Sequence, residues 1–224
     1  MTDSFKEKFR QAVAETEAVV YSYLPEETGH QKTIFEAMNY SVKAGGKRLR
    51  PLLMREVYRL FGGNGPEIGP FMAAMEMIHT SSLIHDDLPC MDNDEYRRGK
   101  LTTWKAYGYD MAVLAGDALM IYAFEVASKA FTMGADPAKV GRAIGILAEK
   151  TGIYGMIGGQ TVDVELTGKA VPREKLDFIY RLKTGALLES SMMIGAVLAG
   201  ASDEEIREVE SMAFEVGLAF QIQD

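Results

Sequence analysis

Apolar residues recur at helical spacing along almost the whole chain, and alternating apolar and polar runs are too short to predict strands. The long segments are filled with Ala, Leu, Glu, Lys and Met, which favour helices. Asp136 before Pro137, Pro172, and Ser202 three residues before Glu205 are typical helix starts. We expect helices over residues 3–23, 30–43, 48–61, 67–87, 105–131, 137–157, 159–167, 172–181, 184–199 and 203–224.

This pattern predicts one all-α domain over residues 1–224, with long helices around a common core. Composition then narrows the class of protein. The chain has 224 residues, 47% of them apolar, which excludes disorder as its main state. A net charge of −8 argues against nucleic acid as a partner, and a single cysteine argues against a disulfide scaffold and for the cytoplasm. The longest nearly apolar run, residues 192–201, is about half of the ~20 residues that a membrane span needs.

The apolar stripe of the fourth expected helix changes character along its length. It begins with Ile68, Met72 and Met75 and continues, in steps of three and four residues, to His79 and Asp86. A face that is apolar at one end and acidic at the other is typical of a cavity with charge at its mouth.

Four acidic residues follow within residues 86–94. A solvated acidic helix end is the ordinary interpretation, but Asp86 and Asp87 oppose the helix dipole there. On an unbroken helix Asp86 and Asp92 would lie about 240° apart, too far to share a cation. Pro89 prevents that continuation, and a turn at this residue would bring Asp92 back beside Asp86. Clustered carboxylates need a cation, and Mg²⁺ with substrate phosphates is the natural one.

Two basic clusters flank the acids in sequence. The first, residues 45–51, reads Gly-Gly-Lys-Arg-Leu-Arg-Pro, and the second, residues 97–100, reads Arg-Arg-Gly-Lys. Cations are unfavourable at a helix N-terminus, so the first cluster needs an external reason, although each cluster alone could be a solvated patch. Arginines suit bidentate phosphate contacts. Together the clusters indicate a substrate with one or two diphosphates. The apolar stripe indicates that the remainder of the substrate is apolar.

With these motifs the chain resembles the trans-isoprenyl diphosphate synthases, the family of farnesyl and geranylgeranyl diphosphate synthases. The resemblance rests on residues 45–51, 76–79, 86–92 (Asp-Asp-Leu-Pro-Cys-Met-Asp, the first aspartate-rich motif), 97–100, 158–163, 183–185 and 217–224. It implies an isoprenoid-synthase-type bundle of long helices around a central cavity. It also implies a homodimeric prenyltransferase that condenses isopentenyl diphosphate with dimethylallyl, geranyl or farnesyl diphosphate.

The resemblance implies roles for individual residues. Isopentenyl diphosphate would be bound by Lys47, Arg50, His79 and Arg98, and the allylic diphosphate by Arg97, Lys183, Thr184 and Gln221. Several Mg²⁺ ions would bridge the diphosphate and four aspartates, namely Asp86, Asp87, Asp92 and Asp224. The catalytic set would be Asp86, Asp87, Asp92, Lys183 and Asp224.

Other polar residues near these motifs have weaker signals. His85 is interpreted as a structural partner, and Cys90 as a small filler in the metal loop. Gln160 and Asp163 share one helix face and either line the site or cap a buried network.

Product length depends, in this family, on side chains just before the first aspartate motif. Ser81 and Ser82 are small, and Leu119, Tyr122 or Ala123 would close the cavity lower down. We therefore expect a twenty-carbon product, geranylgeranyl diphosphate, with farnesyl diphosphate as the alternative.

Two other functions fit parts of the sequence. A non-catalytic partner subunit of a synthase would be expected to have lost aspartates, and a terpene cyclase would not need the cluster from Lys47 to Arg50. We also expect the domain to lack its C-terminal part, because Asp224 is only the start of the second aspartate-rich motif. Residues 1–224 alone should therefore bind the allylic substrate poorly and turn over slowly or not at all.

Overall fold

The structure is a computed structural model that describes the backbone of residues 3–223 and the side chains of residues 5–219. It is helical almost throughout, which confirms the predicted all-α class. The elements are α1 (Asp3–Ser22), α2 (Lys32–Val42), α3 (Leu49–Leu60), α4 (Ile68–Asp86), β1 (Tyr96–Arg97), β2 (Lys100–Leu101), α5 (Thr103–Tyr107), α6 (Tyr109–Ser128), η1 (Lys129–Thr132), α7 (Pro137–Thr151), α8 (Met156–Leu166), α9 (Arg173–Ile179), η2 (Tyr180–Gly185), α10 (Ala186–Ala199) and α11 (Asp203–Gln223).

The chain divides into two compact units, which are described separately. The first comprises Met1–Leu52 and Gly69–Ala127, and the second comprises Leu53–Ile68 and Ser128–Asp224. Helix α3 begins in the first unit and ends in the second. The single domain that the sequence suggests stays a prediction.

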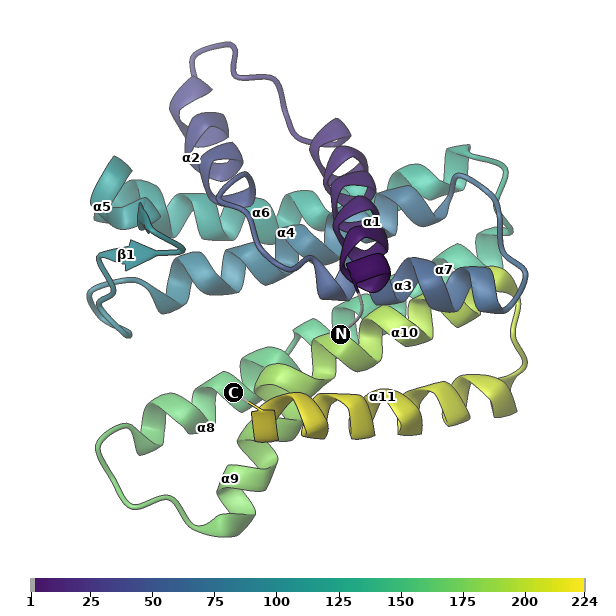
Figure 1. Cartoon of the computed structure of the whole chain (residues 1–224). Coiled ribbons are helices and arrows are strands. Elements are labelled where there is room, and N and C mark those ends of the chain that lie inside the picture. The colour runs from purple at the N-terminus through teal and green to yellow at the C-terminus, as the bar shows by residue number, and fades with distance from the viewer. Residues whose placement is uncertain (1–2, 224) are drawn as a thin grey trace. The chain divides into compact units, whose positions relative to one another are not determined.

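Helix α4 forms the core of the first unit. Phe71, Met72, Met75 and Ile78 are at most 1% exposed, so the apolar stripe that the sequence predicts is buried. Helix α6 runs alongside α4, as Figure 1 shows. The two helices approach closely at Gly116, where a Cβ atom would lie 2.1 Å from Nε2 of His85.

Helix α10 has the same role in the second unit, because its residues from Ala186 to Leu198 are all buried. Helices α7 and α11 pack against it (Figure 1). Lys150 of α7 binds Glu189 of α10 and, at 2.7 Å, Glu210 of α11. Burial alone would lower the pKa of Lys150, but the bonds to the two carboxylates outweigh it and raise the pKa. The three helices are therefore joined by a satisfied ionic cluster.

The predicted helix caps are confirmed, but some predicted boundaries are wrong. The Asp136 side chain accepts a bond from the backbone N–H of Ala138, and Ser202 and Glu205 form a capping box. The helix expected over residues 105–131 is divided at Gly108, whose φ of 100° ends α5. No break separates α9 from α10, because the π-helical segment η2 connects them.

Two helical stretches are long and apolar enough, by length and composition alone, to cross a membrane. They are Tyr109–Thr132 and Arg173–Ala199, and 39% and 78% of their apolar windows are buried within the fold. Core helices pass the same test, so these stretches are weak indications of a membrane span.

Candidate functional site

The aspartate-rich segment forms a tight turn at the end of α4. The backbone N–H of Asp92 donates to the carbonyl of Asp86 at 2.8 Å, and those of Met91 and Asn93 donate to the carbonyl of Leu88 at 2.8 and 3.1 Å. The turn after Pro89 thus returns the chain to Asp86, as the sequence predicts. Asp92 is exposed and Asp86 is half-buried.

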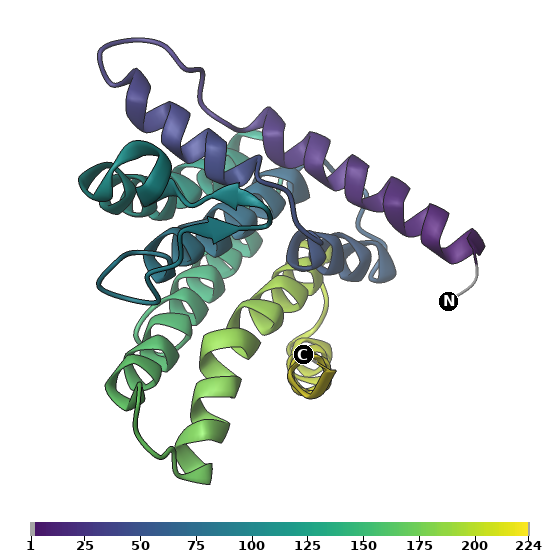
Figure 2. The ribbon, with the colours of Figure 1, turned by 60° about the vertical axis from the view of Figure 1, so that its left-hand side comes forward.

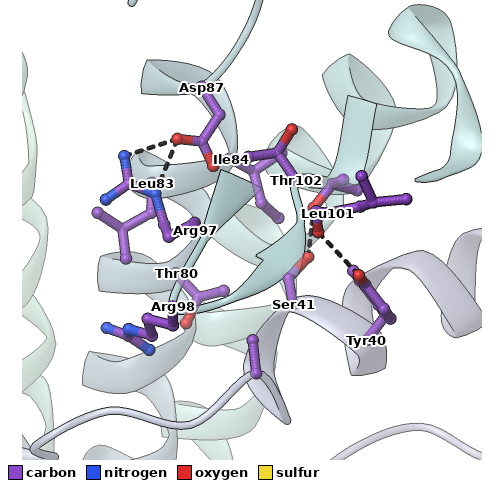
Figure 3. Close-up of a pocket in the computed structure, with 12 residues that line it drawn as sticks. Tyr40, Ser41, Thr80, Leu83, Ile84, Asp87, Arg97, Arg98, Leu101 and Thr102 are labelled. Carbon is purple, nitrogen blue, oxygen red and sulfur yellow. Dashed lines mark hydrogen bonds and ion pairs between the residues drawn. The ribbon is translucent and has the colours of Figure 1, made fainter. Parts of the chain in front are cut away.

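Asp87 is turned to a different partner. Its side chain is only 5% exposed, and its Oδ1 accepts from Arg97 Nε at 2.7 Å and Nη2 at 2.6 Å. Burial raises the pKa of the Asp87 carboxyl, and the bond to Arg97 counteracts this rise. Figure 3 shows the pair at one side of a pocket. Asp87 therefore fixes Arg97, while Asp86 is half-buried and Asp92 is exposed.

The second basic cluster lies on a two-stranded hairpin that the sequence does not predict. Strands β1 and β2 pair antiparallel, and the turn between them has φ values of 53° at Arg98 and 75° at Gly99. Positive φ at both central residues is typical of a type I′ hairpin turn. The Arg98 guanidinium donates to the carbonyl of Gly45, so the hairpin contacts the first basic cluster.

The first basic cluster divides its cations between different surroundings. Lys47 is exposed, Arg50 is half-buried, and Arg48 is buried. Nη1 of Arg50 lies 3.5 Å from Nε2 of His79. Burial and the neighbouring Arg50 lower the pKa of His79 well below its usual range, so the imidazole is neutral. Nε of Arg50 is buried with no partner among the described residues, so a donor remains available here.

A pocket lies between α2, α4 and the hairpin, all in the first unit (Figure 3). Its charged side chains are Arg97, Arg98 and Asp87, and hydroxyl groups add neutral polar atoms, among them those of Ser41, Thr80 and Thr102. Ser41 and Thr103 share a hydrogen bond of 2.6 Å at its wall. In Figure 2 the hairpin formed by β1 and β2 is turned toward the viewer. The second basic cluster thus lines the pocket and, through Arg98, contacts the backbone of the first cluster.

In the second unit, Lys183 and Thr184 lie on the π-helical segment η2. Nζ of Lys183 is 2.6 Å from Oδ2 of Asp163 on α8, and both side chains are partly exposed, at 29% and 41%. Helix α8 approaches η2 closely at Gly159, where a Cβ would lie 2.3 Å from the backbone nitrogen of Lys183. This partly exposed pair is not a buried network, and the role of Asp163 in lining the site stays a prediction.

The remaining residues of interest are placed as follows. Ser81 is buried and Ser82 half-buried, and each hydroxyl donates back to its own helix, to Ile78 and His79. His85 contacts the carbonyl of Val113 at 3.3 Å and Asp117 at 3.5 Å, so it has the structural contacts that the sequence analysis expects. The side chain of Gln221 and all of Asp224 lie outside the described residues.

Cys90 and Arg48 complete the description. The Cys90 thiol is exposed in the aspartate turn and accepts from the Tyr109 hydroxyl at 3.2 Å.

Arg48 is the residue whose buried position the sequence did not lead us to expect. The sequence feature that indicates a buried arginine is Glu76, a single acid within an otherwise apolar stretch of α4. A buried acid needs a buried cation as its partner.

Comparison with known proteins gives consistent matches. A family model for polyprenyl synthetases matches residues 31–224. The chloroplastic geranylgeranyl pyrophosphate synthase of Capsicum annuum is 49% identical over 192 residues, 85% of this chain and 52% of that protein. The farnesyl diphosphate synthase of Geobacillus stearothermophilus is 44% identical over 223 residues, 99% of this chain and 73% of that protein.

A solved structure also matches the fold of this chain. An FPP/GFPP synthase from Zymomonas mobilis, in its apo form, matches with a TM-score of 0.92 at 37% identity, over 100% of this chain and 81% of that chain. This match confirms the fold that the resemblance implied. The chain spans about half the length of several curated relatives that it matches.

Proposed function

Since this chain belongs to the polyprenyl synthetase family, we propose that the whole protein is a prenyltransferase acting on isoprenyl diphosphates. Isopentenyl diphosphate would be condensed with an allylic diphosphate (dimethylallyl, geranyl or farnesyl) to a short all-trans product. The observation that carries the proposal is the meeting of two basic clusters, through Arg98 and Gly45, next to an aspartate turn. Arginines gathered beside carboxylates suit a diphosphate, because guanidinium groups bind phosphate oxygens in pairs and the carboxylates can share a cation with them.

Within the first unit, the proposed contacts follow the observed geometry, and those of the allylic diphosphate follow the resemblance. Isopentenyl diphosphate would bind Lys47, Arg50, His79 and Arg98. The neutral His79 and the unpartnered Nε of Arg50 support this, because each can add a directional hydrogen bond to the charge of the arginines. The allylic diphosphate would bind Arg97, Lys183, Thr184 and Gln221.

The aspartate turn is suited to Mg²⁺. Asp86 and Asp92 are brought together by a main-chain hydrogen bond, and Asp92 is exposed. No group of three acidic, His or Cys side chains that could hold a metal occurs in the part of the chain that the structure describes. Mg²⁺ is usually held by one or two carboxylates, with substrate phosphates and waters as the other ligands. Asp86 and Asp92 would thus hold the ion, with Asp87 fixing Arg97 beside them and Asp224 as a further ligand. When bound, the ion would neutralise diphosphate charge.

The proposed reaction needs no nucleophilic Ser or Cys side chain. The allylic C–O bond breaks, the double bond of isopentenyl diphosphate attacks the carbocation, and a proton is lost from the new C–C product. Arg97 and Lys183 would stabilise the charge on the leaving diphosphate, since fixed cations aimed at developing charge lower the barrier. Apolar side chains would exclude water that would otherwise trap the carbocation.

We propose a twenty-carbon product, with fifteen carbons as the alternative. Ser81 is buried and has a small side chain, so it would not obstruct a growing chain on that face of α4. Leu119 and Ala123 of α6 are buried, and the Tyr122 hydroxyl donates to the carbonyl of Tyr23 at 3.0 Å. If Ser81 is the gate, Ser81→Tyr should shorten the product in chromatography, and Ser82→Tyr tests the second small residue in the same way. An unchanged product would exclude Ser81 as the gate.

We further propose a cytoplasmic homodimer. The single cysteine is typical of a reducing compartment. Helix α6 exposes apolar side chains, with Leu114 at 54% and Ile121 at 72%, which a second copy would cover. Equilibrium sedimentation of Ile121→Glu against the wild type would test the dimer, since a charge in the interface should shift the protein toward the monomer.

The activity is tested by pyrophosphate release from geranyl diphosphate in the full-length protein. We expect release that requires both Mg²⁺ and isopentenyl diphosphate, with a longer prenyl diphosphate as product. Release independent of isopentenyl diphosphate would indicate a cyclase or hydrolase. No release from this protein alone, but an altered product when it is mixed with an active synthase, would indicate a non-catalytic partner subunit.

A further inference from the structure

Arg48 is the most completely bonded cation in the first unit. Its Nε lies 3.0 Å from Glu17 Oε1, and its Nη1 lies 2.6 Å from Glu76 Oε1. Its Nη2 donates to the Tyr21 hydroxyl at 3.1 Å and to the carbonyl of Val42 at 2.7 Å. The side chain is 0% exposed. The guanidinium therefore joins α1, the end of α2 and α4.

The Arg48 backbone has an uncommon conformation. Its φ is 50°, in the left-handed region, and it follows Gly45 and Gly46 at φ values of 91° and 144°. Such a conformation in a residue other than glycine persists where the surroundings determine it, and it is frequent at functional sites. Its carbonyl accepts the first helical bond of α3, from Leu52 at 3.1 Å. The four side-chain bonds thus fix the point at which the basic loop becomes a helix.

The pair formed by Arg48 and Glu76 also determines which side chains meet. Glu76 and His79 lie three residues apart on α4, on one face of that helix. Arg48 and Arg50 lie two residues apart at the start of α3. Once Arg48 is bound to Glu76, Arg50 is brought to His79, where Nη1 and Nε2 are 3.5 Å apart.

We propose that Arg48 is a positioning residue for the isopentenyl diphosphate site, which holds residues 45–50 so that Lys47, Arg50 and Arg98 converge on the diphosphate. This inference rests on the proposed function. Arg48 itself is not a phosphate ligand, because its side chain is wholly buried and four of its five N–H donors are already used. Lysine could not replace it, because a point charge on a flexible stem cannot make the same forked contacts.

Steady-state kinetics of Arg48→Lys in the full-length protein tests the proposal. We expect KM for isopentenyl diphosphate to rise by roughly tenfold or more, since small displacements of positioning groups have effects of this size. KM for the allylic diphosphate should change by less than about threefold, because Arg97 is held separately by Asp87. Arg59→Lys is the matched control, since Arg59 lies on α3 and its guanidinium is 56% exposed. Equal rises in both KM values, or no rise in either at wild-type stability, would overturn the proposal.

Tyr21→Phe covers the case in which Arg48→Lys does not fold. It removes one acceptor of the guanidinium and leaves the packing of the ring in place. The same selective rise in KM is expected, but smaller. Hydrogen exchange at residues 43–50 gives a measure that does not depend on activity: these amides should exchange faster in either variant while those of α10 do not. Absence of condensation by the wild type would refute the proposed function alone, and exchange would then decide the role of Arg48.

Discussion

The two units hold their candidate phosphate-binding cations in different ways. In the first unit, Lys47 and Arg50 flank Arg48, whose guanidinium makes four hydrogen bonds and whose side chain is 0% exposed. In the second unit, Lys183 lies on a π-helical segment and pairs with Asp163, whose side chain is 41% exposed. The contacts of Arg48 fix the backbone that carries Lys47 and Arg50, whereas the pair with Asp163 holds only the end of the Lys183 side chain.

This difference indicates different behaviour when a diphosphate binds. Arg50 and Lys47 would keep their positions, because the contacts that position them are made by Arg48 and not by the ligand site. Lys183 would exchange Asp163 for phosphate oxygens, because an exposed ion pair is weak and easily replaced. The cations of the first unit would thus be in place before a diphosphate binds. In the second unit, the Asp163 carboxylate would first have to leave Lys183.

The largest effect is expected from Glu76→Gln, which leaves the buried Arg48 charge with less compensation. Breaking a buried ion pair by removing one partner typically costs about 3–5 kcal/mol, so the free energy of unfolding in urea should fall by about this amount. Glu7→Gln is the matched control, because Glu7 and its partner Arg10 are 71% and 73% exposed, so their pair should contribute about 0–1 kcal/mol. Similar losses for the two variants would remove the distinction between a buried anchor and a surface pair.

A moderate effect is expected from Gly159→Ala. The new methyl group would lie 2.3 Å from the backbone nitrogen of Lys183, so α8 and η2 would have to separate. Overpacking of this kind costs about 1–3 kcal/mol, and KM for the allylic diphosphate should rise because Lys183 is displaced.

Gly141→Ala is the control for this change, because nothing lies within 4 Å of the added Cβ at that helical position. It should stabilise the protein by about 0.5–1 kcal/mol, as alanine does in place of glycine within a helix. If Gly159→Ala were equally harmless in thermal unfolding, the close approach would not constrain the lysine segment.

The smallest effect is expected from Asp163→Asn. Stability should change by only about 0–1 kcal/mol, and KM for the allylic diphosphate should fall by up to about fivefold, because Lys183 no longer has a competing partner. Asp177→Asn serves as the control, since Asp177 is exposed and pairs with Arg173 at 3.9 Å. A rise in KM would mean that Asp163 orients the lysine rather than competing with the substrate.

Local patterns in the sequence predict much of the fold. Helix α4 begins and ends within one residue of the predicted range, because its apolar stripe is long and Pro89 stops it. The caps at Asp136 and Ser202 are confirmed because the contacts that make a cap lie within three residues. The return of Asp92 to Asp86 follows from the proline and the length of the turn.

Features that depend on distant contacts were not predictable in this way. Strands β1 and β2 have two residues each, too few for an alternating pattern. The segment around Lys183 resembles a helix break, but it continues as a π-helix that packs closely against Gly159, and no local pattern shows this. Arg48 was grouped with its neighbours Lys47 and Arg50, because the acids that bury it come from α1 and α4.

The exposed thiol of Cys90 gives the molecule a built-in reporter. It is the only cysteine in the chain, and it lies within the turn that connects Asp86 with Asp92. A fluorophore attached through a maleimide would therefore label one position without any engineered substitution. Its emission would follow the aspartate turn as Mg²⁺ and a diphosphate are added, so occupancy of this turn becomes measurable apart from turnover.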